Sequence, residues 1–306
     1  MESVKLKFKL TYLIFRHRMR IFIVVFLSKF PSWINDGIRK MECGLKGETY
    51  PNVRKNIGKW KVRAIQIEIT YRCNLLCRNC NRHCNLVNLP YLKDSDMSIG
   101  QIKKFISQVK EKNVHLDAVE VMGGEPLLHP HIEEIISLLF YGLLVPGYTI
   151  YITVSSNGVF KDRVKRIISD HNIKKAFENG MITMNYVPGP KAGRFYCALT
   201  APVDLGLPFG WCAQPRACGT LLNCDGYWPG GPCGAIARMF RLTQYARYDF
   251  PLDFAETWPR LIEDICRYCP LGCGDLENRT QGVVTVSYKK AIESWMKGEA
   301  GAFRKF

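Results

Sequence analysis

Apolar and polar residues alternate along several short stretches in the middle of the chain. Ile65, Ile67 and Ile69 alternate with polar residues, which predicts a β-strand whose apolar side chains share one buried face. Three later stretches have the same character and predict further strands: Ala118–Met122, Tyr148–Val154 and Met181–Tyr186. Turn-forming residues follow each of these three stretches, so the strands are expected to end sharply.

Between the predicted strands, apolar residues recur at helical spacing. In the first predicted helix they stand at positions i, i+3, i+4 and i+7: Ile102, Phe105, Ile106 and Val109. Ser98 and Gln101 form a capping-box pattern just before this helix. Similar patterns at 132–139 and 164–168 predict two more helices. The alternation of strands and helices predicts an α/β fold with a parallel sheet and crossover helices.

Three cysteines follow the first predicted strand. Cys73, Cys77 and Cys80 lie on one loop, close enough to converge on one metal centre. Thiolates prefer soft metals, and a [4Fe–4S] cluster normally takes four of them, so three thiolates leave one iron open. Structural zinc sites are usually built from two separated cysteine pairs, which this triplet does not resemble. Cys84 or His83 remains available as a fourth ligand that would close the site.

Residues suited to ligand binding follow the ends of the next two strands. Gly123 and Gly124 let the backbone approach a ligand closely, and Glu125 adds an anionic acceptor that suits a ligand ammonium group. A Ser-Ser-Asn-Gly turn at 155–158 ends the third strand. Function in parallel α/β sheets gathers at the carboxyl ends of the strands, so we expect these turns and the cysteine loop to share one rim.

The cysteine triplet after the first strand and the Gly-Gly-Glu-Pro turn after the second resemble the radical S-adenosylmethionine (SAM) enzymes, over about residues 60–186. The resemblance implies that Cys73, Cys77 and Cys80 hold a [4Fe–4S] cluster whose fourth iron is chelated by the methionine amino and carboxylate groups of SAM. It assigns six residues to SAM: Gly123, Gly124 and Glu125 at the amino group, and Ser155, Asn157 and Asn185 at the ribose or carboxylate. A polar residue at a strand end can also serve only to cap a neighbouring helix.

In this family the reduced cluster donates one electron to SAM, and the resulting 5′-deoxyadenosyl radical abstracts a hydrogen atom from the substrate. The resemblance also implies a partial (β/α)6-type parallel barrel. Little chain separates the fourth predicted strand from Cys212, so the barrel is either truncated or takes later strands from beyond Cys212. The predicted organisation has three parts: a basic N-terminal extension at 1–59, the barrel at 60–210 and a small cysteine-rich auxiliary-cluster domain at 211–306.

A second group of cysteines lies in the loop-rich C-terminal part: Cys212, Cys218, Cys224, Cys233, Cys266, Cys269 and Cys273. Their pattern, with an Asp-Gly turn at 225–226 and a distant CxxC, resembles the twitch or SPASM auxiliary-cluster domains. The resemblance implies one auxiliary [4Fe–4S] cluster with four ligands: Cys218, Cys233, Cys266 and Cys269. Cys212 or Cys273 can replace a member of this set, and Cys224 lies inside the turn. A zinc site built around the last three cysteines is the alternative.

The positive charge lies mainly at the N-terminus. The first 72 residues hold 16 Lys and Arg but only 5 Asp and Glu, and the formal net charge of the 306-residue chain is +16. Residues 1–30 alternate basic and bulky apolar residues, which indicates a helix that packs on its own domain or lies on an anionic membrane surface or a partner protein. We recognise no nucleic-acid-binding module, so we expect no nucleic acid partner. The apolar run Ile21–Leu27 is far shorter than a membrane-spanning helix.

The chain has 13 cysteines and no recognisable export signal, which indicates a reducing cytoplasm, where clustered cysteines more often bind metal. We therefore predict a cytoplasmic radical SAM enzyme that oxidises or epimerises a sugar-like or other small metabolite, with a one-electron donor such as flavodoxin or ferredoxin. A peptide-modifying enzyme is the alternative within the family. A non-enzymatic iron–sulfur or zinc protein is the alternative from another class, although it leaves the Gly-Gly-Glu-Pro turn unexplained.

Overall fold

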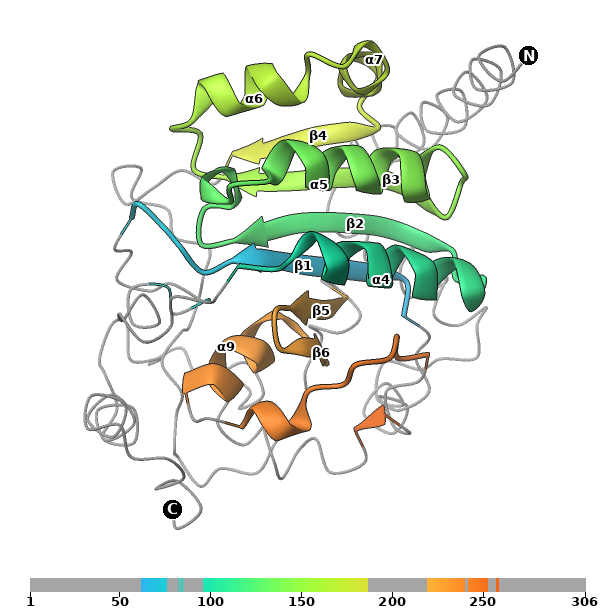
Figure 1. Ribbon diagram of the computed structural model, residues 1–306, viewed down its shortest axis with the longest axis vertical. Coiled ribbons are helices and arrows are strands. Elements are labelled where there is room, and N and C mark those ends of the chain that lie inside the picture. The colour runs from blue at the N-terminus through green and yellow to red at the C-terminus, as the bar shows by residue number, and fades with distance from the viewer. Residues whose placement is uncertain are drawn as a thin grey trace, which may run out of the picture.

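The computed structural model describes residues 62–75, 82, 84, 96–186, 219–239, 242–252 and 257–258, and within these residues six strands form one sheet. The strands lie in the order β4-β3-β2-β1-β5-β6 (Figure 1). Their bounds are β1 Ala64–Thr70, β2 Leu116–Gly123, β3 Thr149–Ser156, β4 Ile182–Tyr186, β5 Thr220–Asn223 and β6 Gly226–Trp228. All neighbouring strands pair parallel except β5 and β6, which pair antiparallel. The predicted α/β fold with a mostly parallel sheet is confirmed.

The described helices include those that the apolar spacing predicts. Their bounds are α4 Ile99–Glu111, α5 Ile132–Leu139, α6 Lys161–Ile167, α7 His171–Glu178 and α9 Gly231–Met239, with shorter turns η4 Pro126–Leu128, η5 Phe140–Leu144 and η7 Thr243–Tyr245. The Ser98 hydroxyl accepts a hydrogen bond from the Gln101 backbone, and the Gln101 side chain accepts one from the Ser98 backbone, which confirms the capping box of α4. The apolar pattern does not predict α7, which buries only Ile173 and Ala176.

Helices α4 and α5 lie along one face of the sheet (Figure 1). Ile65, Ile67 and Ile69 are fully buried in the hydrophobic core beneath them, together with the apolar residues of both helices. Burying a side chain of this size contributes about 1.5–3 kcal/mol. The alternation in β1 therefore fixes which face of this strand meets the helices.

Strand β5 comes from beyond Cys212, which is one of the two outcomes expected for the barrel. It pairs with β1 on the edge away from β2, with Ile65 opposite Thr220 and Ile67 opposite Leu222. The strand order therefore differs from that of a consecutively wound barrel, in which the next strand would lie beside β4. A tight turn joins β5 to β6, and α9 lies next to this hairpin (Figure 1).

The face of β1–β4 away from α4 and α5 is polar. Gln66, Glu120, Thr153 and Thr183 stand in one register row across the four strands. Parallel strands are normally apolar on both faces because helices cover both, so a polar row of this kind indicates a functional surface. It forms the second part of the candidate site, beside the rim at the carboxyl ends of the strands.

Several predictions concern residues outside the described ranges. These are the N-terminal extension at 1–59 with its basic segment, the expected ligands Cys77, Cys80, Cys218, Cys266 and Cys269, and the alternatives His83, Cys212 and Cys273. Among the residues that the structure describes, no helix combines the length and apolar character needed to cross a membrane.

Candidate active site at the carboxyl rim of the sheet

The cysteine loop and the Gly-Gly-Glu-Pro turn touch each other. The Gly124 amide donates to the Thr70 carbonyl at 2.9 Å. A Cβ atom placed on Gly124 would lie 2.4 Å from the Arg72 carbonyl oxygen and 2.9 Å from the Cys73 Cβ. Gly123 has a φ of +152°, and a Cβ there would lie 2.1 Å from the Thr70 oxygen. Both positions therefore require glycine so that the backbone can lie against the first cysteine.

The Glu125 side chain holds the ends of β2 and β3 together. Its carboxylate is fully buried and accepts three hydrogen bonds: from the backbone amide of Leu127 at 3.0 Å, the Ser156 hydroxyl at 2.9 Å and the backbone amide of Asn157 at 2.8 Å. Burial raises the pKa of Glu125, and these three donors oppose the rise. In the structure this carboxylate thus serves three donors of the chain, and its expected use as an acceptor for a ligand ammonium group stays a prediction.

The other three residues expected at SAM lie at the ends of β3 and β4. The side-chain amide of Asn157 donates to the side-chain oxygen of Asn74 at 2.8 Å and so joins the third rim turn to the cysteine loop. Ser155 instead donates to Glu120 at 2.7 Å on the polar face, and Asn185 donates to the Ser155 hydroxyl at 3.4 Å. The shared rim is confirmed for the three turns, with Ser155 and Asn185 directed along the sheet.

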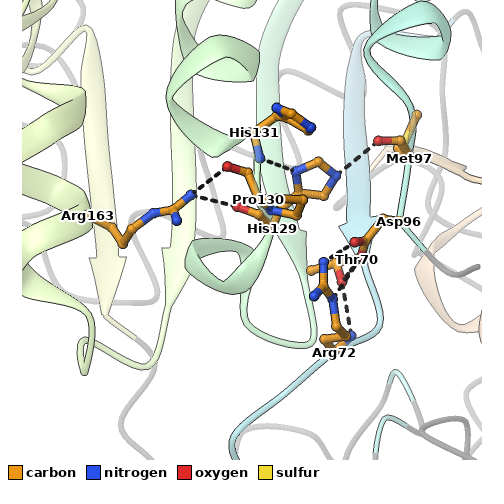
Figure 2. A network of polar contacts seen from close by, with 8 residues as sticks. All are labelled: Thr70, Arg72, Asp96, Met97, His129, Pro130, His131 and Arg163. Atoms are coloured by element: carbon orange, nitrogen blue, oxygen red, sulfur yellow. Dashed lines mark hydrogen bonds and ion pairs between the residues drawn. The ribbon is translucent and has the colours of Figure 1, made fainter. Parts of the chain in front are cut away.

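A buried histidine fixes the segment after the Gly-Gly-Glu-Pro turn (Figure 2). The His129 Nδ1 atom accepts from the His131 amide at 3.1 Å, so Nε2 carries the proton and donates to the Met97 carbonyl at 3.0 Å. Burial lowers the pKa of His129, which keeps the ring neutral. Arg163 of α6 donates to the carbonyls of His129 and Pro130 at 2.7 and 3.1 Å.

The residue before Cys73 is anchored in the same region (Figure 2). Arg72 forms an ion pair with Asp96, and its Nε donates to the Asp96 carboxylate at 3.2 Å. The Thr70 hydroxyl donates to the same carboxylate at 2.5 Å and accepts from the Arg72 amide at 3.1 Å. Cys73 therefore leaves β1 in a direction that both its own strand and the residues before α4 determine.

Arg82, two residues after the last cysteine of the triplet, is buried against the polar face. Its guanidinium lies 2.6 Å from the Glu68 carboxylate and donates to the Gln66 side-chain oxygen at 3.2 Å and to the Met122 sulfur at 2.8 Å. A Cβ atom on Gly231, at the start of α9, would lie 1.9 Å from the guanidinium. The Arg82 side chain is therefore fixed between β1, β2 and α9.

Tyr71 extends this network to the β5–β6 hairpin. Its hydroxyl donates to Glu68 at 2.5 Å and accepts from the Asn223 amide at 2.8 Å. The guanidinium of Arg238 lies 4.6 Å from the centre of the Tyr71 ring. Burial and the Glu68 carboxylate hold the pKa of Tyr71 well above its ordinary value. The hairpin and α9 are thus bonded directly to the strand that leads into the cysteine loop.

Local sequence patterns do not predict this buried network. One signal was available in β1, where Gln66 and Glu68 alternate with the buried isoleucines and so must face the other side of the sheet. Arg82 contacts both of these side chains, whereas Asn223 and Arg238 join the network through Tyr71. All three are distant from β1 in the sequence, so only the fold brings them together.

The described cysteines have different surroundings. Cys73 is half-buried at the rim, and Cys84 is buried. Arg238 donates to the Cys224 sulfur at 2.8 Å, and burial raises the pKa of this thiol to about 12. Cys233 packs in an apolar cluster with Leu221, Trp228, Ala237 and Ala246. Of the expected cluster ligands, the structure describes Cys73 for the first cluster and Cys233 for the auxiliary cluster. Within the described residues, no three side chains of the kinds that bind metal lie together.

Residues 67–190, fewer than half of the chain, match the sequence profile of the radical SAM superfamily. This segment carries the cysteine triplet, the glycine turn and the ends of β3 and β4, so the match supports the resemblance that these motifs indicate.

Individual proteins are similar over parts of the chain. An S-adenosylmethionine-dependent nucleotide dehydratase from Selenomonas ruminantium is 30% identical over 76 residues, which is 25% of this chain and 25% of the dehydratase. A crystal structure of BtrN in an open conformation has a TM-score of 0.34 and 14% identity, covering 55% of this chain and 69% of BtrN. BtrN in complex with AdoMet and 2-DOIA has a TM-score of 0.38 and 12% identity, covering 56% of this chain and 74% of BtrN.

Proposed function

We propose that this protein is a radical SAM enzyme. The contact between Cys73 and Gly124 carries the proposal, because it brings the start of the cysteine triplet against the turn expected to meet the methionine end of SAM. The thiol at the tip of β1 and the close glycine backbone suit a cluster ligand beside a small ligand. When bound, the [4Fe–4S] cluster and SAM supply the electron and the 5′-deoxyadenosyl radical that abstracts hydrogen from the substrate.

The chain's own residues position these groups. Cys73, Cys77 and Cys80 would hold the cluster, and Gly123 and Gly124 would present backbone groups to the methionine amino group. Asn157 would contact SAM at the side of β3, next to the cysteine loop, to which its side chain is bonded. Ser155 and Asn185 would lie further along the polar face, toward the substrate.

The substrate that we propose is a small molecule. The polar face of β1–β4 supports this, because its closely spaced hydrogen-bonding side chains suit a compact polar ligand. The partial similarity to a nucleotide dehydratase supports the same class, while oxidation or epimerisation remains the proposed outcome. A peptide substrate is the second candidate within the family.

We further propose an auxiliary [4Fe–4S] cluster in the C-terminal part. Its ligands would be Cys218, Cys233, Cys266 and Cys269. The hairpin with its Asp-Gly turn and the position of Cys233 near the start of α9 support this proposal. Two such clusters contain about eight iron ions per chain. Iron and sulfide analysis after anaerobic reconstitution should give that number, and about four would show that the second cluster is absent.

The remaining parts of the proposal concern the protein's surroundings. We propose a cytoplasmic enzyme whose electron comes from a flavodoxin or ferredoxin. The basic segment at 1–30 would contact an acidic partner or an anionic membrane surface, because its charge favours both.

The test of the proposed function is SAM cleavage. Wild-type protein is reconstituted anaerobically with iron and sulfide, supplied with SAM and dithionite, and assayed for 5′-deoxyadenosine. We expect time-dependent formation that the Cys77→Ala variant abolishes. An intact cluster that yields no 5′-deoxyadenosine would refute the proposal. Zinc in place of iron, with no visible absorption, would instead favour the non-enzymatic protein.

A further inference from the structure

The polar face of the sheet has a carboxylate at its centre. Glu120 lies on β2, opposite Gln66 of β1 on one side and Thr153 of β3 on the other. It precedes Gly123 by three residues, which at about 3.3 Å per residue places it roughly 10 Å along the strand from the rim. Glu120 thus lies in the interior of the polar face, and its separation from the rim is comparable to the length of a small molecule.

One hydrogen-bond donor reaches Glu120 from β1. The Arg82 guanidinium has no acceptor atoms, so its contact with Gln66 at 3.2 Å must involve the side-chain oxygen of Gln66. The amide nitrogen of Gln66 then points the other way and donates to the Glu120 Oε2 atom at 2.7 Å. Arg82 therefore sets the orientation of the Gln66 side-chain amide, so the group that Gln66 turns toward Glu120 is its NH2 donor.

A second donor reaches Glu120 from β3. The Asn185 amide nitrogen donates to the Ser155 hydroxyl at 3.4 Å, and that hydroxyl donates to the Glu120 Oε1 atom at 2.7 Å. The two chains of hydrogen bonds therefore converge, and both end on the same carboxylate. Glu120 is the final acceptor of both chains.

The negative charge of Glu120 has no ion-pair partner among the described residues, unlike the buried charge of Glu68. Glu68 lies within 2.6 Å of Arg82, whereas the structure's described ion pairs include none for Glu120, whose two described partners are neutral. A carboxylate has about four acceptor positions, and these two partners use one on each oxygen. Glu120 is also only partly buried. A partly exposed anion with spare acceptor positions favours a cationic donor.

We propose that Glu120 is a substrate-binding residue that receives an ammonium group of a small polar substrate. This inference rests on the proposed function, since it takes the polar face as the place where the substrate of a radical SAM enzyme binds. It narrows the substrate class to amine-bearing molecules, because a phosphate or carboxylate in the same place would be repelled by the Glu120 charge. Thr153 and Thr183, which bond each other at 3.0 Å, provide neutral hydroxyls in the same register row.

The test uses three probes with one sugar ring: D-glucosamine, D-glucose and D-glucose 6-phosphate. Their dissociation constants for the purified full-length protein are measured by ligand-observed NMR. A charge-assisted hydrogen bond is worth about 1.5–3 kcal/mol, so we expect glucosamine to bind at least about tenfold more tightly than glucose 6-phosphate.

The Glu120→Gln variant should reduce this preference about tenfold. The exchange is compatible with the fold, because glutamine can accept from Gln66 while its amide donates to Ser155, whose hydroxyl both donates and accepts. Melting temperatures of both proteins check this. Glu134→Gln, the same change on the exposed face of α5, is the matched control and should leave the preference unchanged.

Three results would overturn the inference: equal binding of the amine and the phosphate, an amine preference that survives Glu120→Gln, or no binding of any probe to folded wild-type protein. The failure of the proposed function is distinguishable, because it appears as the absence of 5′-deoxyadenosine in the wild-type assay without any probe. The probe measurements do not depend on that reaction.

Discussion

Gly124 is the residue at which the two parts of the rim meet. A methyl group there would have to push the Arg72 carbonyl and Cys73 away from contacts of 2.4 and 2.9 Å. We therefore expect Gly124→Ala to destabilise the fold by about 1–3 kcal/mol, the usual cost of overpacking, and to lower the iron retained per chain. Urea unfolding and iron analysis measure the two effects.

Gly100 offers the matched control for this substitution. It lies inside α4, where the nearest atom to an added Cβ is the Ser98 hydroxyl oxygen at 3.6 Å. Gly100→Ala should stabilise the protein by about 0.5–1 kcal/mol, because alanine loses less conformational entropy in a helix. If Gly124→Ala behaves like Gly100→Ala, the described contact between the glycine turn and the cysteine loop is wrong.

His129 makes the stability of the rim dependent on pH. The pKa of His129 is lowered by burial, so the unfolded chain takes up a proton at a higher pH than the folded protein does. Stability should therefore fall as the pH decreases below about 6.5, the ordinary histidine value. The measurement is the free energy of unfolding between pH 8 and pH 5 in wild type and His129→Gln.

The variant should lose part of this pH dependence, since glutamine does not titrate. His115→Gln, at an exposed position, serves as the control and should keep the wild-type slope. An identical slope in His129→Gln and wild type would contradict the assignment of a buried neutral ring to this position.

At the scale of elements, the buried pair of Glu68 and Arg82 joins β1 to the segment after the cysteines. Removing one partner leaves a buried charge, which typically costs about 3–5 kcal/mol. We expect Arg82→Met to lose stability in that range near pH 7, measured by urea unfolding. Arg63→Met, which breaks the exposed pair with Asp117, should cost about 0–1 kcal/mol.

The loss in Arg82→Met should be smaller at pH 5. Burial already raises the pKa of Glu68, and Arg82 is the main group that opposes this rise. Without Arg82 the folded protein binds a proton at Glu68 more readily than the unfolded chain does, so stability is gained as the pH falls. A loss that is equal at both pH values would show that Glu68 is not the unbalanced charge.

The elements that the sequence predicts best are those with one buried face. The alternation in β1 and the apolar spacing in α4 and α5 are local patterns, so these elements can be read from short windows. The position of β5 beside β1 could not be predicted, because it depends on a pairing between residues about 150 positions apart. The rim was predictable because strand ends of a parallel sheet coincide. The Glu68 network was not, since Arg82, Asn223 and Arg238 come from three separate segments far from β1 in the sequence.

At the scale of the whole molecule, the sheet links the two cysteine regions. The carboxyl end of β1 leads into the first cysteine loop, and β1 also pairs with β5. The hairpin of β5 and β6 carries Cys224, and the following helix α9 carries Cys233. The expected boundary at 210–211 thus precedes two strands that belong to the same sheet. A hydrogen bond from Asn223 to the Tyr71 hydroxyl connects the two regions directly.

Under the proposed function, three thiolates hold the first cluster and its fourth iron stays open for SAM. The most direct measurement is the electron paramagnetic resonance spectrum of the reduced, reconstituted protein with and without SAM. Binding of SAM at that iron should change the g-values of the cluster signal, and Cys84→Ala should respond in the same way. A signal that is the same with and without SAM, and that responds to SAM only after Cys84→Ala, would show instead that Cys84 is the fourth ligand and that the wild-type cluster has no iron open for SAM.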